Sequence, residues 1–303
     1  MVISIPNSTV MVSHPSRIAN QLQEWLSKRL EGSGRAWLDE ATQQFAENAS
    51  ERVLFTRFSA ASRKVGKADL TLTEDELKIA QTLRTGWMPR QWSVDQAVRT
   101  VLLLTFPSEK ADRYLAALEK LFAAADVAEQ VALYQTLPLF PHPERFMARA
   151  IDGLRTNITA VFNAIVLHNP YPADYFNEAA WNQMVLKALF VDSRLSQIQG
   201  LDARANGKLA KMLSDYAHER WAAGRAVNPQ LWRPIGPFAE GKLLTDLERV
   251  LTQGEPFEQQ AAALALSSAP VPEAKGLLDR KPELKQAIAD GQLTWQTFSL
   301  THQ

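Results

Sequence analysis

The sequence has no cysteine, no surplus of charge and no long apolar run. Without cysteine it cannot form a disulfide, a thiolate nucleophile or a Cys-ligated zinc site, and this composition fits a cytoplasmic protein. Its 33 Lys and Arg residues balance 33 Asp and Glu residues, which argues against a nucleic-acid-binding protein because such a protein needs a basic face. The best apolar run, residues 101–106, is far shorter than the about 20 residues of a membrane span. We therefore expect a cytoplasmic protein without a membrane span.

Motifs of the common enzyme classes are also missing. The chain has no GxGxxG, P-loop or G-x-S-x-G sequence, and His218-Glu219 lacks the second histidine of an HExxH zinc site. It also lacks the Asp-rich pairs by which all-α prenyl-diphosphate enzymes hold magnesium. The spacing of His142, His168 and His218 does not suggest ligand geometry, and lone histidines more often pack or cap. We predict no metal site and no cofactor.

Helical periodicity dominates what the sequence does contain. Apolar residues recur at three- and four-residue spacing along most of the chain, and capping boxes begin helices after Thr73 and Ser93. Prolines at 256, 272 and 282 begin short helices near the C-terminus. No segment shows the alternation of a half-buried strand. The sequence therefore predicts an all-α protein.

The connections between these helices indicate how they pack. They are short and rich in Pro and Gly, and residues 258–288 resemble degenerate HEAT-type units. We predict a single all-helical domain over residues 1–303, built as an α-α superhelix of irregular stacked helix pairs like those of HEAT and armadillo proteins. A closed helical bundle is the alternative. Residues 1–14 are expected to form an irregular or extended arm.

The segment from residue 142 to 194 is the longest strongly apolar stretch. It predicts two helices with a corner near Thr156, with one long helix as the alternative. A stop follows at the prolines of residues 169–172, and then a further helix from Glu178 to Val191 capped by Asn177. The last of these helices is apolar nearly all round, so it should be buried on several sides. The residues expected in its core are Trp181, Met184, Val185 and Leu189.

Polar residues in and around this stretch are the candidates for a site. Asn182, Gln183 and Lys187 interrupt the apolar helix, so each must bond to a neighbouring segment or face a wet groove. Arg220 lies on the same helical side as Tyr216, with Glu219 at the margin of that face. These groups form either a polar ligand site or core ion pairs, such as Glu219 with Arg204 or Arg225. The ligand-binding residues under the first hypothesis are Asn169, Tyr171, Asp174, Tyr175, Asn182, Lys187, His218, Glu219 and Arg220.

Five sequence motifs resemble the EboA family. They are NPYPADYF at residues 169–176, AWNQMVLKALF at 180–190, GLDARAN at 200–206, DYAHERWAAGR at 215–225 and LWR at 231–233. The resemblance is strong over about residues 140–240, and elsewhere it is limited to the helical pattern. The family belongs to a bacterial gene cluster associated with moving prenylated or aromatic secondary metabolites out of the cytoplasm. The resemblance implies that process without giving a mechanism.

Two classes of function remain open. The first is a non-enzymatic helical scaffold that holds a small aromatic or prenylated molecule, or a partner protein, on a concave face. The second is an enzyme of undescribed type that acts on an aromatic or isoprenoid intermediate. The missing enzyme motifs favour the first, and the zero net charge disfavours a DNA-glycosylase-like helical repeat. The resemblance implies partners from the same gene cluster, with a membrane prenyltransferase-like protein as the candidate.

Overall fold

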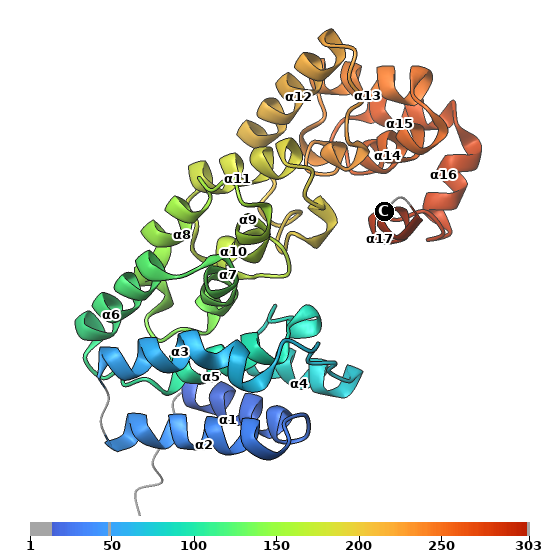
Figure 1. Ribbon diagram of the computed structural model, residues 1–303. Helices are drawn as coiled ribbons and strands as arrows, with labels where there is room; N and C mark the ends of the chain where they lie inside the picture. Colours follow the sequence, from blue (N-terminus) through green and yellow to red (C-terminus); the bar gives the residue numbers. More distant parts are fainter. Residues whose placement is uncertain (1–13, 48–49, 302–303) are drawn as a thin grey trace, which may run out of the picture. The chain divides into compact units, whose positions relative to one another are not determined.

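The computed structural model describes residues 14–47 and 50–301 (Figure 1). Within these ranges the regular structure consists of 17 α-helices joined by short 3₁₀ turns, and the β-type pairing is a single bridge between Asp69 and Ser93. The all-α prediction is therefore confirmed. The predicted arm lies outside the described residues except for His14, which already belongs to the first helix.

The chain forms two compact units, Met1–Tyr171 and Pro172–Gln303. The single-domain and superhelix predictions concern the arrangement of the whole chain, and they stay predictions. The helices of the first unit are α1 (His14–Ser27), α2 (Gly32–Glu47), α3 (Glu51–Val65), α4 (Glu74–Leu83), α5 (Val94–Thr105), α6 (Ala111–Ala124), α7 (Val127–Thr136), α8 (Met147–Gly153) and α9 (Thr159–Val166). Its 3₁₀ turns are η1 (Pro89–Gln91), η2 (Leu137–Leu139) and η3 (Pro143–Phe146).

Helix α5 is the centre of the first unit. It packs against α1, α2, α3 and α7 (Figure 1), and nearly all its residues are buried, including the charged Asp95 and Arg99. The Arg99 guanidinium donates to the Asp95 carboxylate at 2.5 Å and to the Phe58 carbonyl at 3.2 Å. Buried charges must be paired and hydrogen-bonded. Asp95 neutralises Arg99 within α5, and the bond from Arg99 to the Phe58 carbonyl fixes how α5 sits against α3.

The corner predicted near Thr156 is present. Helix α8 ends at Gly153, α9 begins at Thr159, and the Thr156 hydroxyl accepts from the Ile158 backbone N–H at 3.1 Å. Gly153 lies where α8 meets α7 and α9. A Cβ there would lie 2.6 Å from Cζ of Tyr134 and 2.8 Å from Ile165, so any side chain at this crossing would force these neighbours to move.

The second unit contains seven α-helices after the short α10 (Tyr171–Tyr175), which lies at the boundary. They are α11 (Glu178–Phe190), α12 (Gly207–Ala222), α13 (Gly241–Gln253), α14 (Pro256–Ser267), α15 (Pro272–Asp279), α16 (Pro282–Ala289) and α17 (Trp295–Thr301). The 3₁₀ turns are η4 (Leu195–Gln197), η5 (Pro229–Trp232) and η6 (Gly236–Phe238). The prolines at 256, 272 and 282 begin helices as predicted.

Helix α14 is the centre of the second unit. It packs against α13, α15, α16 and α17 (Figure 1), and residues 261–266, which are alanine and leucine, are all buried. Small side chains let neighbouring backbone approach closely. Gly236 of η6 is an example, because a Cβ there would lie 2.6 Å from the Ala265 carbonyl oxygen.

Helix α11 has the start and the core that the sequence predicts. The Asn177 side chain accepts from the Ala180 N–H at 2.9 Å, which caps the helix. Trp181, Met184 and Val185 are completely buried, and Leu189 is nearly so. The C-terminal end of this helix forms part of the groove described next.

Candidate functional site

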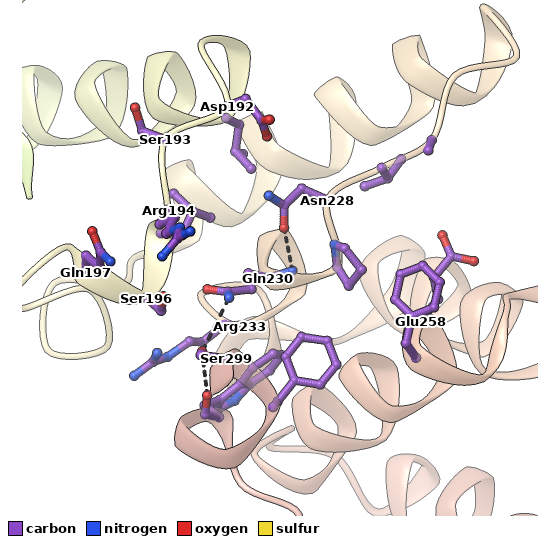
Figure 2. Close-up of a pocket in the computed structure, with 18 of the residues that line it drawn as sticks. Asp192, Ser193, Arg194, Ser196, Gln197, Asn228, Gln230, Arg233, Glu258 and Ser299 are labelled. Atoms are coloured by element: carbon purple, nitrogen blue, oxygen red, sulfur yellow. Dashed lines mark hydrogen bonds between the residues drawn. The ribbon is translucent and has the colours of Figure 1, made fainter. Parts of the chain in front are cut away.

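An open-sided groove of about 1160 Å³ lies in the second unit at the end of α11 (Figure 2). Its walls come from the end of α11, the η4 segment, one side of α12, the segment before and within η5, the start of α14, and α17. Its volume lies slightly above the about 300–1,000 Å³ of typical small-molecule pockets. The lining residues are Leu189, Phe190, Asp192, Ser193, Arg194, Leu195, Ser196, Gln197, Tyr216, Arg220, Ala226, Val227, Asn228, Pro229, Gln230, Arg233, Phe257, Glu258, Trp295, Gln296, Phe298, Ser299 and Leu300.

A Schellman motif ends α11 at the groove. The Ser193 N–H donates to the Ala188 carbonyl at 2.8 Å, and the Asp192 N–H donates to the Leu189 carbonyl at 3.3 Å. Asp192 takes the left-handed conformation that this motif requires, with φ of 57°. The chain then turns away from the helix axis, and Phe190 in the last helical turn is left pointing away from the core.

The groove gathers exposed apolar side chains. Phe190 is 78% exposed, Leu300 is 68% exposed and Phe257 is 38% exposed, and all three line it. Among the described residues, six large hydrophobic side chains are exposed, so half of them meet in this one place. Single exposed apolar residues are ordinary, whereas a cluster in a concave surface is typical of a binding site.

The polar floor of the groove is the Gln230 side chain. Its residue is only 9% exposed, and its Nε2 donates to the Ser299 hydroxyl at 3.3 Å (Figure 2). Its Oε1 is buried and has no hydrogen-bond partner among the described residues. A buried acceptor without a donor is costly, so this oxygen marks a position at which a ligand donor would be favoured.

Three arginines line the groove and differ in how they are held. Arg233 donates to the Asp202 carboxylate at 2.6 and 2.5 Å, and Arg220 donates its Nε to the Ala226 carbonyl at 2.9 Å. Within residues 14–47 and 50–301, the Arg194 guanidinium has no hydrogen bond and no ion pair. Among the three lining arginines, Arg194 is therefore the one whose guanidinium donors are all available to a ligand.

Two of the predicted site residues, Asn169 and Tyr171, belong to the first unit. The Asn169 amide donates to the Tyr134 and Ala164 carbonyls and accepts from the Tyr171 N–H at 2.9 Å. The Tyr171 hydroxyl donates to the Pro143 carbonyl at 2.6 Å. These bonds tie together the end of α9, the start of α10 and η3.

The other predicted residues of the α10–α11 region lie in the second unit. Asp174 is exposed, and Tyr175 and Lys187 are half-buried. The buried Asn182 amide exchanges hydrogen bonds with the Asn206 amide at 3.1 and 2.8 Å. Asn206 in turn caps α12 by accepting from the Leu209 N–H at 2.9 Å, so this amide pair joins α11 to the start of α12.

The predicted residues on α12 point in different directions. The His218 Nε2 lies 2.8 Å from the buried Asp246 carboxylate of α13, and its ring meets Trp221 edge to face. Glu219 is exposed and, among the described residues, forms no ion pair with Arg204 or Arg225. Arg220 lines the groove, and the other eight predicted residues do not.

The motifs that carry the family resemblance contact one another in the second unit. Arg204 illustrates this, because it donates to the carbonyls of Pro172, Ala173 and Phe176 and stacks 4.7 Å from the centroid of the Trp181 ring. Other contacts between motifs include Asn182 with Asn206, Asp202 with Arg233, and Trp221 with Trp232. The motifs thus hold residues 172–233 together, including most of the groove wall.

The chain matches a protein family over a range that includes this network. The family model described as metabolite traffic protein EboA matches residues 18–236, well over half of the 303-residue chain. The chain belongs to the EboA family. No curated protein and no solved structure matches it. The matched range contains the α11, η4, α12 and η5 sides of the groove, while α14 and α17 lie beyond it.

The described part of this EboA-family chain lacks two kinds of feature. No helix there is both long and apolar enough to pass through a bilayer. No group of three or more His, Asp or Glu side chains there is arranged to hold a metal ion.

Proposed function

We propose that the protein is a non-enzymatic binding protein of metabolite traffic, and that its groove in the second unit holds a small aromatic or prenylated molecule. The main support for this proposal is that three exposed apolar side chains, Phe190, Phe257 and Leu300, line the same groove as Gln230. Apolar walls with a few directed polar groups are the usual make-up of a small-molecule site. The molecule would pass to or from a membrane prenyltransferase-like protein of the same gene cluster.

The apolar surface is large enough to hold such a molecule reversibly. Covering about 200 Å² of apolar surface contributes roughly 5 kcal/mol at about 25 cal/mol per Å², and ordering costs reduce that value. The expected dissociation constants are therefore in about the millimolar range. Weak, reversible binding suits a protein that passes its cargo on.

Calorimetric titration with naphthylacetic acid and its uncharged methyl ester tests this proposal. We expect at least one of them to bind, and we expect Phe190→Gln and Leu300→Gln to weaken that binding about tenfold. The matched control is Ile79→Gln, which changes a 41% exposed apolar residue of the first unit and should leave binding unchanged. No binding of either compound, or binding that both groove variants leave unchanged, would contradict the proposal.

The alternative is an enzyme that acts on an aromatic or isoprenoid intermediate, and the His218–Asp246 pair favours it. A buried carboxylate 2.8 Å from an imidazole that is 40% exposed could orient a general base. The same Asp246 also accepts from the Ser214 hydroxyl at 2.7 Å, so it equally ties α12 to α13. Conversion of supplied cargo that is lost in His218→Gln, with the fold and cargo binding intact, would favour the enzyme.

A further inference from the structure

We propose that the groove selects apolar molecules that carry a carboxylate with a hydroxyl group beside it. Arg194 would bind the carboxylate, and Gln230 would accept the hydroxyl proton. This inference rests on the proposed function, because it assumes that the groove holds a small molecule. It adds the chemical class of that molecule.

The hydrogen bonds around Ser299 determine which Gln230 atom is available. The Ser299 hydroxyl has one proton, which it donates to the Trp295 carbonyl at 2.7 Å. Its oxygen can therefore only accept from Gln230, so the NH₂ group of the amide must face it. This leaves Oε1 as the buried, unpartnered atom. An acceptor in this position favours a ligand that brings an O–H or N–H group.

The charges around the groove favour an anionic partner for Arg194. Arg233 is neutralised by Asp202. Of the two lining carboxylates, Glu258 accepts from the Glu255 N–H at 2.8 Å at the start of α14, and Figure 2 shows Asp192 well apart from the Arg194 guanidinium. Arg194 and Gln230 both line the groove.

A ligand carboxylate suits Arg194 and Gln230 better than a diphosphate does. A guanidinium binds a carboxylate through two parallel hydrogen bonds, and one available guanidinium suits a single negative charge. A diphosphate needs several cations or metal ions. Arg220 is the second lining arginine that has no ion pair in the described structure, and its Nε already donates to the Ala226 carbonyl. The apolar body of the ligand would cover Phe190, Phe257 and Leu300.

Three matched ligands separate the contributions: naphthylacetic acid, its methyl ester, and naphthylglycolic acid, which adds a hydroxyl beside the carboxylate. Calorimetry on the full chain at neutral pH should show the acid binding about tenfold more tightly than the ester, the usual gain from a charge-assisted hydrogen bond. The hydroxy acid should bind more tightly still. Added salt should reduce the preference for the acid and leave the ester unchanged.

Two variants assign these preferences to residues. Arg194→Gln should make the acid and the ester bind equally, and Gln230→Met should remove the gain from the hydroxyl. Arg225→Gln, which changes an exposed arginine outside the groove lining, should change neither. Equal binding of acid and ester by the unchanged protein, or a preference for the acid that persists in Arg194→Gln, would overturn the inference. Because the ester reports apolar binding alone, its loss in Leu300→Gln would still support the proposed function.

Discussion

The two units treat their large aromatic side chains differently. In the first unit Trp25, Trp87 and Trp92 are buried in contact, with ring centroids 5.7 and 5.9 Å apart. Tyr114 is likewise enclosed by the rings of Phe106, Phe140 and Phe146. These aromatic groups fill a core, and their effect should be on stability.

The second unit places some of its large apolar side chains at a surface. Among the described residues of the first unit, the exposed ones are Ile79, Val127 and Ile158, which lie on or beside three different helices and are each near 40% exposed. Phe190 and Leu300 of the second unit are far more exposed, and they share one groove. Exposed apolar side chains therefore indicate a binding surface when their exposure is large and several of them line one groove, because scattered exposed apolar residues are ordinary.

The largest expected loss of stability comes from emptying the aromatic core of α11. Trp181→Ala should lower the free energy of unfolding by an amount near the top of the roughly 3–5 kcal/mol range for buried aromatic residues. The ring is fully buried, and it also supports Arg204, whose pKa burial lowers. Chemical denaturation measures the change. A loss under about 1 kcal/mol would show that Trp181 is not a core residue.

Removing the buried carboxylate of the first unit should have the next largest effect. Asp95→Ala leaves Arg99 buried without its counter-ion, which costs roughly 3 kcal/mol. We take the lower end of the usual range because Arg99 keeps its hydrogen bond to the Phe58 carbonyl and its position over the Phe58 ring. The control is Glu74→Ala, which breaks the exposed pair with Arg90 and should barely change denaturation. Similar losses in both variants would contradict the distinction between buried and exposed pairs.

Local chemistry made the helices predictable from the sequence. The side chains of Thr73 and Asn177 cap the helices whose starts they predicted, and Pro256 begins α14. Each signal acts within about one turn of the chain, so one sequence suffices to identify it. The whole-chain superhelix depends on contacts between distant helices, and no local signal determines those.

The candidate site could be predicted much less well, because its residues meet only through tertiary packing. Asn169 was attractive as a polar residue beside prolines, but it bonds backbone groups around the α9–α10 turn. The sequence does not single out Phe190, because its helix is apolar nearly all round. It does not single out Gln230 either, because that residue lies in an ordinary turn. The pattern could have drawn attention to Arg194, a cation directly after the central apolar stretch.

Acid should distinguish the ion pairs of the first unit from its apolar core. Burial raises the pKa of Glu76, but hydrogen bonds from Arg29 and from the Thr73 backbone outweigh this, so its pKa lies below the ordinary value of 4.5. A lowered folded-state pKa contributes stability that is complete above 4.5 and is lost as the pH falls through the folded value.

The variant Glu76→Gln should therefore lose stability relative to the natural chain at neutral pH, and the gap should narrow as the pH falls below about 4.5. This loss should be smaller than that of Asp95→Ala, because the Arg29–Glu76 pair is partly solvated. Denaturation midpoints measured across this pH range provide the test. A gap that stays constant with pH would show that the charge of Glu76 does not contribute to stability.

The smallest expected effect on stability is at Phe190. This residue allows buried and exposed aromatic side chains to be compared within one helix. It lies on the same helix as Trp181 but is 78% exposed, so Phe190→Ser should change the free energy of unfolding by no more than about 0.5 kcal/mol. Binding of methyl naphthylacetate should nevertheless weaken several-fold, because Phe190 supplies apolar wall to the groove. Denaturation and calorimetry on one preparation measure both quantities. Lost stability with unchanged binding would place Phe190 among the structural aromatics, like those of the first unit, and would remove one wall from the proposed site.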